Sequence, residues 1–223
     1  RLLLLIGLAT LLLPGVGIGG NQALAQSRSV EYASIDVTLD LRQDGTFHVT
    51  EVQRVAFSGG SYSNGFREIS RTRTEAIENV TVEEVVNGVA IPYEYESPQA
   101  FNQAPGTYTT QNQGNNIRVD WSFPPTRDEI RTFEVEYDVL GALRVYADAD
   151  PPNERISWMV VGPELTRNVP VREASFTINL PEPVDEANVI WFTSAGTPPV
   201  ESNGGRTWTW TASDLRSGEG FEV

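Results

Sequence analysis

The chain has 223 residues, 39% of them hydrophobic, which is enough for one domain of ordinary size with its own core. Thirty acidic residues against sixteen basic ones give a net charge of −14, and such a surface repels the phosphate backbone of nucleic acids. Cysteine is absent, which excludes disulfides and thiol catalysis, and lysine is absent, which excludes lysine nucleophiles. His48 is the single histidine, so a histidine-based zinc site is not expected, and neither is a cofactor.

The N-terminal segment has the pattern of a secretory signal peptide. Residues 2–13 form an apolar run, which is shorter than the ~20 residues needed to span a bilayer. The sequence Ala23-Leu24-Ala25 then has the small-x-small pattern of a signal peptidase site. We predict a signal peptide over residues 1–25, cleaved after Ala25, with an uncleaved signal anchor as the alternative. Residues 26–33 are expected to be a short linker.

The next stretch, residues 34–57, predicts an antiparallel hairpin. Ile35, Val37 and Leu39 alternate with polar residues, which places them on one face of a strand. Gly45 accepts the positive φ of a tight turn, and Phe47 begins a return strand that alternates in the same way.

A glycine- and serine-rich loop over residues 58–65 leads to a cluster of arginines. Arg67, Arg71 and Arg73 follow one another closely, and the aromatic residues Tyr62 and Phe66 precede them. Because the guanidinium group binds carboxylates and phosphates, this segment is a candidate binding patch for an anion or a protein partner. The competing interpretation is that these arginines pair with carboxylates of the same domain.

Further strands are expected along the rest of the chain. Asn87-Gly88 between two apolar runs predicts a hairpin with a type I′ turn, and residues 97–116 are expected to be a long mobile loop. Residues 189–192 are expected to be a short buried run. Other alternating segments are residues 117–123, 132–139, 155–161, 171–180 and 207–211.

Ten or more short strands separated by turns, with almost no helical periodicity, predict an all-β fold. We expect one antiparallel β-sandwich over residues 34–223.

Two groups of residues resemble the DUF2207 family of predicted membrane proteins. The first is Asp44-Gly45 with Val49 and Glu51, followed by Gly65-Phe66-Arg67-x-Ile69; the second is Phe133-x-Val135-x-Tyr137, Arg155-Ile156-Ser157-Trp158, Val161-Gly162 and Leu180-Pro181. The resemblance covers residues 35–223. It implies an extracytoplasmic domain, followed by a membrane anchor downstream of Val223, and it implies no assigned activity.

An acidic turn is the best candidate for calcium binding. Asp148, Asp150 and Glu154 lie close together with Asn153, and calcium takes oxygen ligands. Their spacing fits no standard calcium loop, so a solvated acidic turn is the alternative.

Paired aromatic residues leave a carbohydrate-binding role open. Trp208 and Trp210 share one strand face, and Tyr93 and Tyr95 have the same spacing. Such side chains stack on sugars when exposed and fill the core when buried. Tyr62 and Phe101, in expected loops, are the better candidates for exposed contacts.

Catalysis finds little support in the sequence. His48 is the only possible histidine base and is expected at the surface of a strand, and no G-x-S-x-G motif occurs. A glycoside hydrolase needs two marked carboxylates, and none stands out. The sequence therefore predicts a secreted, membrane-anchored binding or structural module of the cell envelope, without enzymatic activity, whose partner is an envelope protein or glycan. A carbohydrate-binding module and, further behind, a glycoside hydrolase are the alternatives.

Overall fold

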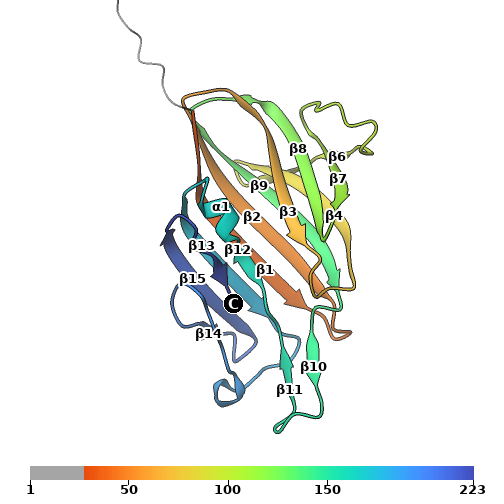
Figure 1. Cartoon of the computed structure of the whole chain (residues 1–223), viewed down its shortest axis with the longest axis vertical. Coiled ribbons are helices and arrows are strands. Elements are labelled where there is room, and N and C mark those ends of the chain that lie inside the picture. The colour runs from red at the N-terminus through yellow and green to blue at the C-terminus, as the bar shows by residue number, and fades with distance from the viewer. Residues whose placement is uncertain (1–27) are drawn as a thin grey trace, which may run out of the picture.

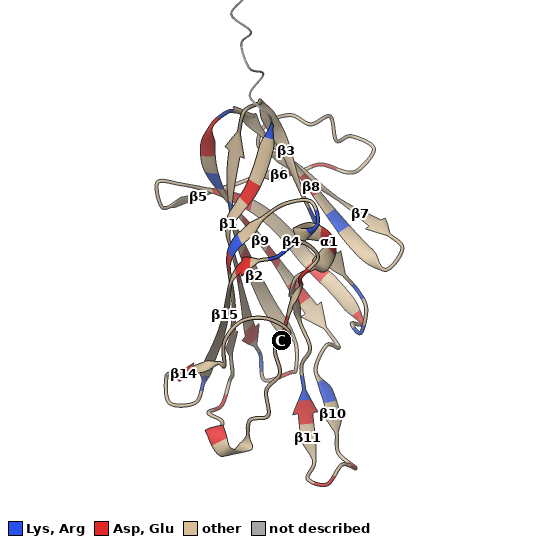
Figure 2. Cartoon of the chain, turned by 60° about the vertical axis from the view of Figure 1, so that its left-hand side comes forward, with Lys and Arg blue, Asp and Glu red and all other residues tan. Residues whose placement is uncertain are grey.

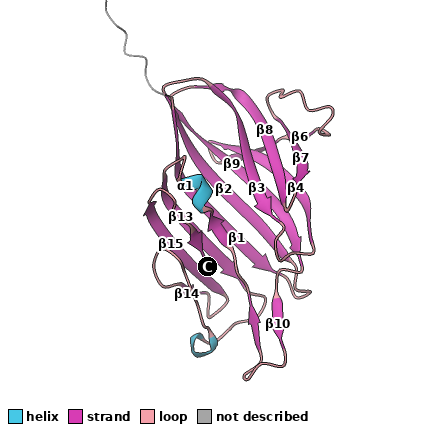
Figure 3. Cartoon of the chain, viewed as in Figure 1, coloured by secondary structure: helices cyan, strands magenta, loops and turns pink. Residues whose placement is uncertain are grey.

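The computed structural model describes residues 28–223. The expected signal peptide and the first residues of the linker lie outside this range. Strands dominate the described chain, as Figure 3 shows. The elements in chain order are β1 (Ser29–Leu41), β2 (Phe47–Ser58), β3 (Tyr62–Ser70), β4 (Ala76–Val86), β5 (Val89–Pro92), β6 (Glu94–Tyr95), β7 (Thr107–Gln113), β8 (Asn116–Thr126), β9 (Glu129–Leu140), β10 (Arg144–Tyr146), β11 (Asn153–Arg155), β12 (Met159–Val161), α1 (Pro163–Thr166), β13 (Val171–Asn179), a 3-10 turn η1 (Glu186–Asn188), β14 (Val200–Ser202), β15 (Thr207–Leu215) and β16 (Phe221–Glu222).

Eight strands form one large sheet in the order β14-β15-β13-β1-β2-β9-β4-β5. A second sheet has the order β3-β8-β7-β6, and β10-β11 and β12-β16 are two-stranded ribbons. The four-stranded sheet lies over the part of the large sheet that contains β2, β9 and β4 (Figure 1). The helix α1 and the β12-β16 ribbon lie over the part that contains β1 and β13 (Figure 1).

The expected β1–β2 hairpin is confirmed. Leu39 pairs with Val49, and Gly45 has φ +83° in the turn. The strand β1 begins at Ser29, so residues 29–33, expected as a linker, belong to the sheet. The type I′ turn is also supported, because Asn87 and Gly88 both have positive φ.

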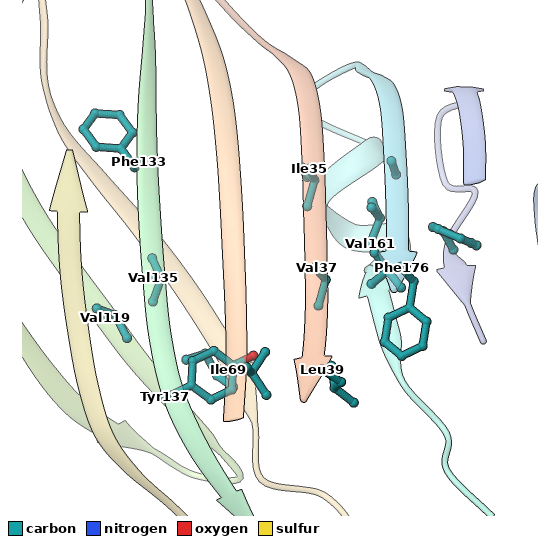
Figure 4. Close-up of a cluster of buried hydrophobic side chains, with 14 of the residues drawn as sticks. Ile35, Val37, Leu39, Ile69, Val119, Phe133, Val135, Tyr137, Val161 and Phe176 are labelled. Atoms are coloured by element: carbon teal, nitrogen blue, oxygen red, sulfur yellow. The ribbon is translucent and has the colours of Figure 1, made fainter. Parts of the chain in front are cut away.

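The core lies between the large sheet and its cover. Trp121 and Phe123 of β8 contact Phe133 of β9, with ring centroids 5.5 and 5.0 Å apart. On the other side, Val161 and Phe176 are buried together with the β1 side chains. Figure 4 shows this interior face, with Val37 and Tyr137 among the labelled side chains.

The prediction of a mostly β fold is confirmed, but the purely antiparallel arrangement is wrong. The strands β1 and β13 are parallel, with Val37 opposite Phe176, and β6 and β7 are parallel as well. Alternation of apolar residues reports burial of one face and carries no information on strand direction, so the mixed sheets could not be read from it.

Two local expectations are also corrected. Residues 107–113, expected within a mobile loop, form β7. The expected buried run at residues 189–192 is largely exposed: Ile190, Trp191 and Phe192 are solvent-exposed, and only Val189 packs partly against the core. In the part of the chain that the structure describes, no helix is long and apolar enough to cross a membrane.

Candidate functional site: an arginine-lined pocket

A cavity of about 730 Å³ lies where the two parts of the covering layer meet. Its wall on one side is the end of β3 and the loop that follows, including Ile69. On the other side are residues next to β12 and β16, including Trp158 and Glu222. Tyr137 of the large sheet also lines it and is 1% exposed. Four separate stretches of the chain, within residues 67–74, 137–146 and 155–159 and at Glu222, therefore form one pocket.

Four of the sixteen arginines line this pocket: Arg67, Arg73, Arg144 and Arg155. The only carboxylate among the lining residues is that of Glu222, which accepts a hydrogen bond from the Ser157 hydroxyl at 2.9 Å. In a chain of net charge −14, a pocket with this excess of positive charge is a candidate anion-binding site.

Arg67 is held by a buried carboxylate. Its Nε donates to Glu51 Oε2 at 2.6 Å and its Nη2 to Glu51 Oε1 at 3.1 Å, which is a bidentate pair. The Glu51 side chain is fully buried and also accepts a hydrogen bond from the Tyr137 hydroxyl at 2.6 Å. Burial, together with the adjacent Glu51 charge, raises the pKa of Tyr137 well above its usual value. Tyr137 thus holds the Glu51 carboxylate, and the carboxylate in turn keeps Arg67 fixed at the pocket wall.

Burial alone would lower the pKa of Arg67, but the Glu51 charge and hydrogen bonds outweigh it and raise the pKa above its usual value. The guanidinium group therefore stays protonated at any physiological pH.

Arg144 and Arg155 are directly opposite each other in the β10-β11 ribbon. Figure 2 shows the two blue bands side by side at that end of the ribbon. The Arg155 guanidinium lies over the Tyr146 ring, 4.7 Å from its centroid, and its Nε donates to Asn153 Oδ1 at 2.9 Å. Like charges directly opposite each other destabilise a strand pair, so an anion bound between them would remove an unfavourable contact.

Arg73 comes from the loop after β3, where it has φ +66°. Its carbonyl oxygen accepts a hydrogen bond from Arg144 Nη2 at 2.9 Å, which ties the loop to β10. Within residues 28–223, no carboxylate lies within 4.0 Å of the guanidinium groups of Arg73, Arg144 or Arg155. These three arginines are exposed and available to a ligand.

The structure divides the predicted binding patch. Arg67 and Arg73 line the pocket, while Arg71 donates to the Gly114 carbonyl. Phe66 is on the outer face of β3, 52% exposed, with the Arg118 guanidinium 4.0 Å above its ring. The Tyr62 hydroxyl donates to the carbonyls at the ends of β1 and β2.

The predicted calcium ligands do not form a cluster. Asp148 and Asp150 lie in the loop between β10 and β11, and Glu154 lies on β11 opposite Val145. Across residues 28–223, no group of three or more His, Asp or Glu side chains is close enough together to hold a metal ion.

Of the four aromatic residues in the pairs considered for sugar binding, only Tyr95 is exposed. Trp208 and Trp210 are both buried, at 3% and 6% exposure, and pack in the core, which removes the main support for a tryptophan platform. Tyr93 is buried and donates to Glu84, whereas Tyr95 is 52% exposed. Phe101 is half-buried in the loop between β6 and β7.

His48 lies on the outer face of β2, on the side away from the pocket. Its Nδ1 is 3.1 Å from Asp138 Oδ1, and its side chain is 32% exposed. This agrees with the surface position that its place in the strand predicts.

Glu51, Arg144 and Arg155 are not among the site residues predicted from the sequence. A signal existed for Glu51, because it occupies an inward position of β2, between Val49 and Gln53, where an apolar residue is expected. A charged residue at such a position needs a partner of opposite charge, and Arg67 was already a candidate.

Comparison with solved structures finds partial likenesses at low identity. A candidate protease from Parabacteroides distasonis ATCC 8503 matches with TM-score 0.48 and 12% identity, over 87% of this chain and 40% of that chain. An M1 zinc metallopeptidase from Deinococcus radiodurans matches with TM-score 0.41 and 14% identity, over 87% of this chain and 42% of that one. A two-domain M1 zinc metallopeptidase variant bound to L-arginine matches with TM-score 0.43 and 14% identity, over 87% and 42%.

This chain thus spans about two fifths of the length of those structures, and likenesses at this level carry no argument about activity. No curated protein matches the sequence. The family model for the N-terminal domain of predicted membrane proteins, DUF2207, matches residues 31–223, which is most of the chain. The protein therefore belongs to the DUF2207 family.

Proposed function

We propose that this chain is an extracytoplasmic binding module of a membrane-anchored protein, and that it holds an anionic group of its partner in the arginine-lined pocket. The observation that carries the proposal is the set of three exposed arginines without a carboxylate partner among the described residues, all lining one cavity of about 730 Å³. Pockets of roughly 300–1,000 Å³ are typical of ligand sites. The module acts by contact and carries out no bond-making step.

The location outside the cytoplasm is supported by the apolar run at residues 2–13 and by Ala23-Leu24-Ala25. The family description, a predicted membrane protein, supports the anchor. The full-length gene tests the anchor: an apolar span of about 20 residues downstream of Val223 is expected, and a gene without one contradicts it.

The pocket is tested by anion binding to the purified protein. Citrate and sulfate, added separately to the millimolar range, are expected to raise the melting temperature, because a ligand that binds only the folded state stabilises it. The double variant R144Q/R155Q is expected to bind citrate at least tenfold more weakly.

The matched control is R54Q, which removes one exposed arginine from the outer face of β2, away from the pocket. It is expected to bind citrate like the unaltered protein. Equal loss of binding in R54Q and in the pocket variants would show a general charge effect and would contradict a site in the pocket.

A cell-envelope carbohydrate-binding role is the second candidate, and one observation favours it. A groove of about 430 Å³ is lined by Tyr95 and Tyr108, whose rings are 5.5 Å apart, together with the amides of Asn79, Gln111 and Asn112. Tyr95 is 52% exposed and packs edge-on against the buried Tyr108, and an exposed aromatic ring beside amide groups suits a neutral sugar. Binding of envelope glycan fragments that is abolished in Y95A and unchanged in R144Q/R155Q would support this candidate.

A further inference from the structure

We propose that the anion is a carboxylate of an extended acidic peptide, which pairs with the open edge of β3 and places that carboxylate among the pocket arginines. This inference rests on the proposed function of the pocket and specifies the chemical class of its ligand.

The first observation is that β3 is an edge strand. It hydrogen bonds to β8 on one side only, and the four-stranded sheet ends there. Arg71 N donates to Asn115 O at 2.7 Å, which continues the register in which Arg67 is opposite Val119 and Ile69 is opposite Ile117. In an antiparallel ladder, bonded and non-bonded pairs alternate. The N–H and C=O groups of Phe66, Glu68 and Ser70 therefore point away from β8.

These groups have no other backbone partner. None of the backbone hydrogen bonds that residues 28–223 form outside their strand ladders involves Phe66, Glu68 or Ser70. Edge strands are commonly protected by proline, by bulges or by lysine. The irregularity in β3 lies between Tyr62 and Asn64, so the segment from Gly65 to Ser70 is a regular edge that can accept another strand.

The second observation is that this edge leads into the pocket. Arg67, Ile69 and Ser70 of β3 all line the cavity, as does Arg73 just beyond the strand. A strand added along residues 65–70 would extend about 20 Å at 3.4 Å per residue and would run beside the cavity. Every second side chain of that strand would point towards the interior.

The third observation is charge complementarity. The inward side chain would meet Arg144 and Arg155, whose planar guanidinium groups match the geometry of a carboxylate. Glu68, the one acidic residue on the free edge, is on the outer face, where it lies 3.4 Å from Arg118. It does not oppose an acidic side chain that enters the pocket. Main-chain hydrogen bonds would supply affinity and the carboxylate would supply specificity, as in other strand-addition complexes.

The test uses the purified protein and a panel of N-acetylated, C-amidated octapeptides of alternating threonine and valine, with one glutamate moved through the eight positions. Matched panels carry glutamine at the same positions or N-methyl groups along one edge. At least one glutamate peptide is expected to bind at least tenfold more tightly than its glutamine and N-methyl counterparts. Its binding is expected to slow hydrogen exchange at the amides of Phe66, Glu68 and Ser70.

Two protein variants separate the parts of the inference. R144Q/R155Q is expected to abolish the preference for glutamate over glutamine. The variant E68P removes a backbone N–H that points away from β8. An edge strand tolerates proline at such a position. E68P is expected to weaken binding of the glutamate peptide at least tenfold, while citrate binding and the circular dichroism spectrum stay unchanged.

The outcomes distinguish this inference from the proposed function. If citrate binds in the pocket and no peptide slows exchange at the β3 edge, the strand-addition inference is wrong and the anion site stands. Tighter binding of inositol phosphates or of anionic lipid vesicles than of every peptide would likewise overturn the peptide assignment. If neither citrate nor the glutamate peptides bind, both proposals are wrong.

Discussion

Glu51 shows how a single buried carboxylate organises the pocket wall. It lies at an inward position of β2 and is surrounded by apolar side chains such as Val49. A carboxylate in this environment is tolerated because Arg67 and Tyr137 together supply three hydrogen bonds. The pair fixes the position of the strand β3 over β2, and it fixes an arginine where the pocket begins.

Removing the arginine of this pair should be strongly destabilising. R67M keeps the side-chain length but leaves the Glu51 charge buried with only the Tyr137 hydroxyl as partner, so a loss of about 3–5 kcal/mol in the free energy of unfolding is expected. Urea denaturation measures it. The double variant E51Q/R67M is expected to recover part of the loss, because no buried charge remains. A double variant no more stable than R67M would contradict this account.

Asp138 on the outer face of β9 should make stability depend on acid pH. Burial alone would raise its pKa, but hydrogen bonds from Asn79 and His48, with the Arg42 guanidinium 2.9 Å away, lower the pKa below its usual value. A lowered pKa in the folded state means that the stabilisation is complete above about pH 4, the value in unfolded chains, and is lost as the pH falls further.

D138N should therefore be less stable than the unaltered protein at pH 7, and the difference should shrink below about pH 4. Urea midpoints at pH 7, 5, 4 and 3 measure it. D148N is the control, because the Asp148 side chain is exposed and makes no hydrogen bond with the described residues. A difference between D138N and the unaltered protein that stays constant down to pH 3 would refute the assignment.

The strand β3 packs with its backbone in close contact with a core tryptophan. Gly65 is opposite Trp121 in the β3–β8 pairing, and a Cβ atom at Gly65 would lie 2.5 Å from Trp121 Cε2. Trp121 is 2% exposed and packs against Phe133, so its ring has little room to move. Glycine is thus required at position 65 because a larger residue would collide with the Trp121 ring. Its φ is not positive, so backbone conformation is not the reason.

The substitution G65A is expected to lower the free energy of unfolding by about 1–3 kcal/mol, which is the usual effect of overpacking a core. Thermal and urea denaturation measure it. G162A is the matched control, since a Cβ at Gly162 meets no atom within 4 Å. Equal stability of G65A and G162A would show that β3 can shift away from Trp121.

At the scale of the whole molecule, charge is distributed unevenly. The pocket holds four arginines, whereas Glu134, Glu136 and Asp138 occupy successive outward positions of β9 on the other face of the large sheet. There Glu83 is directly opposite Glu134, and burial, with the charges of Glu136 and Glu83, raises the pKa of Glu134. Repulsion among these carboxylates therefore opposes folding on the face away from the pocket.

Salt should stabilise the protein for this reason. Raising sodium chloride from about 10 mM to 150 mM shortens the Debye length from about 30 Å to about 8 Å and screens repulsion between exposed carboxylates. The urea midpoint is expected to increase, and E134Q should increase it at low salt and reduce its dependence on salt. A midpoint that falls with added chloride would contradict the repulsion argument.

Most of the long strands, and the faces that they bury, follow from local patterns in the sequence, whereas β7 does not. The alternation in residues 34–57 and 132–139 depends on the two-residue period of a strand, which is local, and the turns at Gly45 and Asn87-Gly88 depend on local φ preferences. The close spacing of arginines after residue 66 placed Arg67 and Arg73 among the candidate ligand-binding residues.

The order of the strands and the contacts between distant residues depend on how the whole chain packs. Segments far apart in the chain meet when β1 pairs in parallel with β13 and when Arg73 joins Arg144 and Arg155. The free edge of β3 likewise depends on the order of the strands in its sheet. Local periodicity leaves these choices open, because many orders of strands bury the same apolar faces. They are settled by how the two layers pack and by which buried charges, such as Glu51, find a partner.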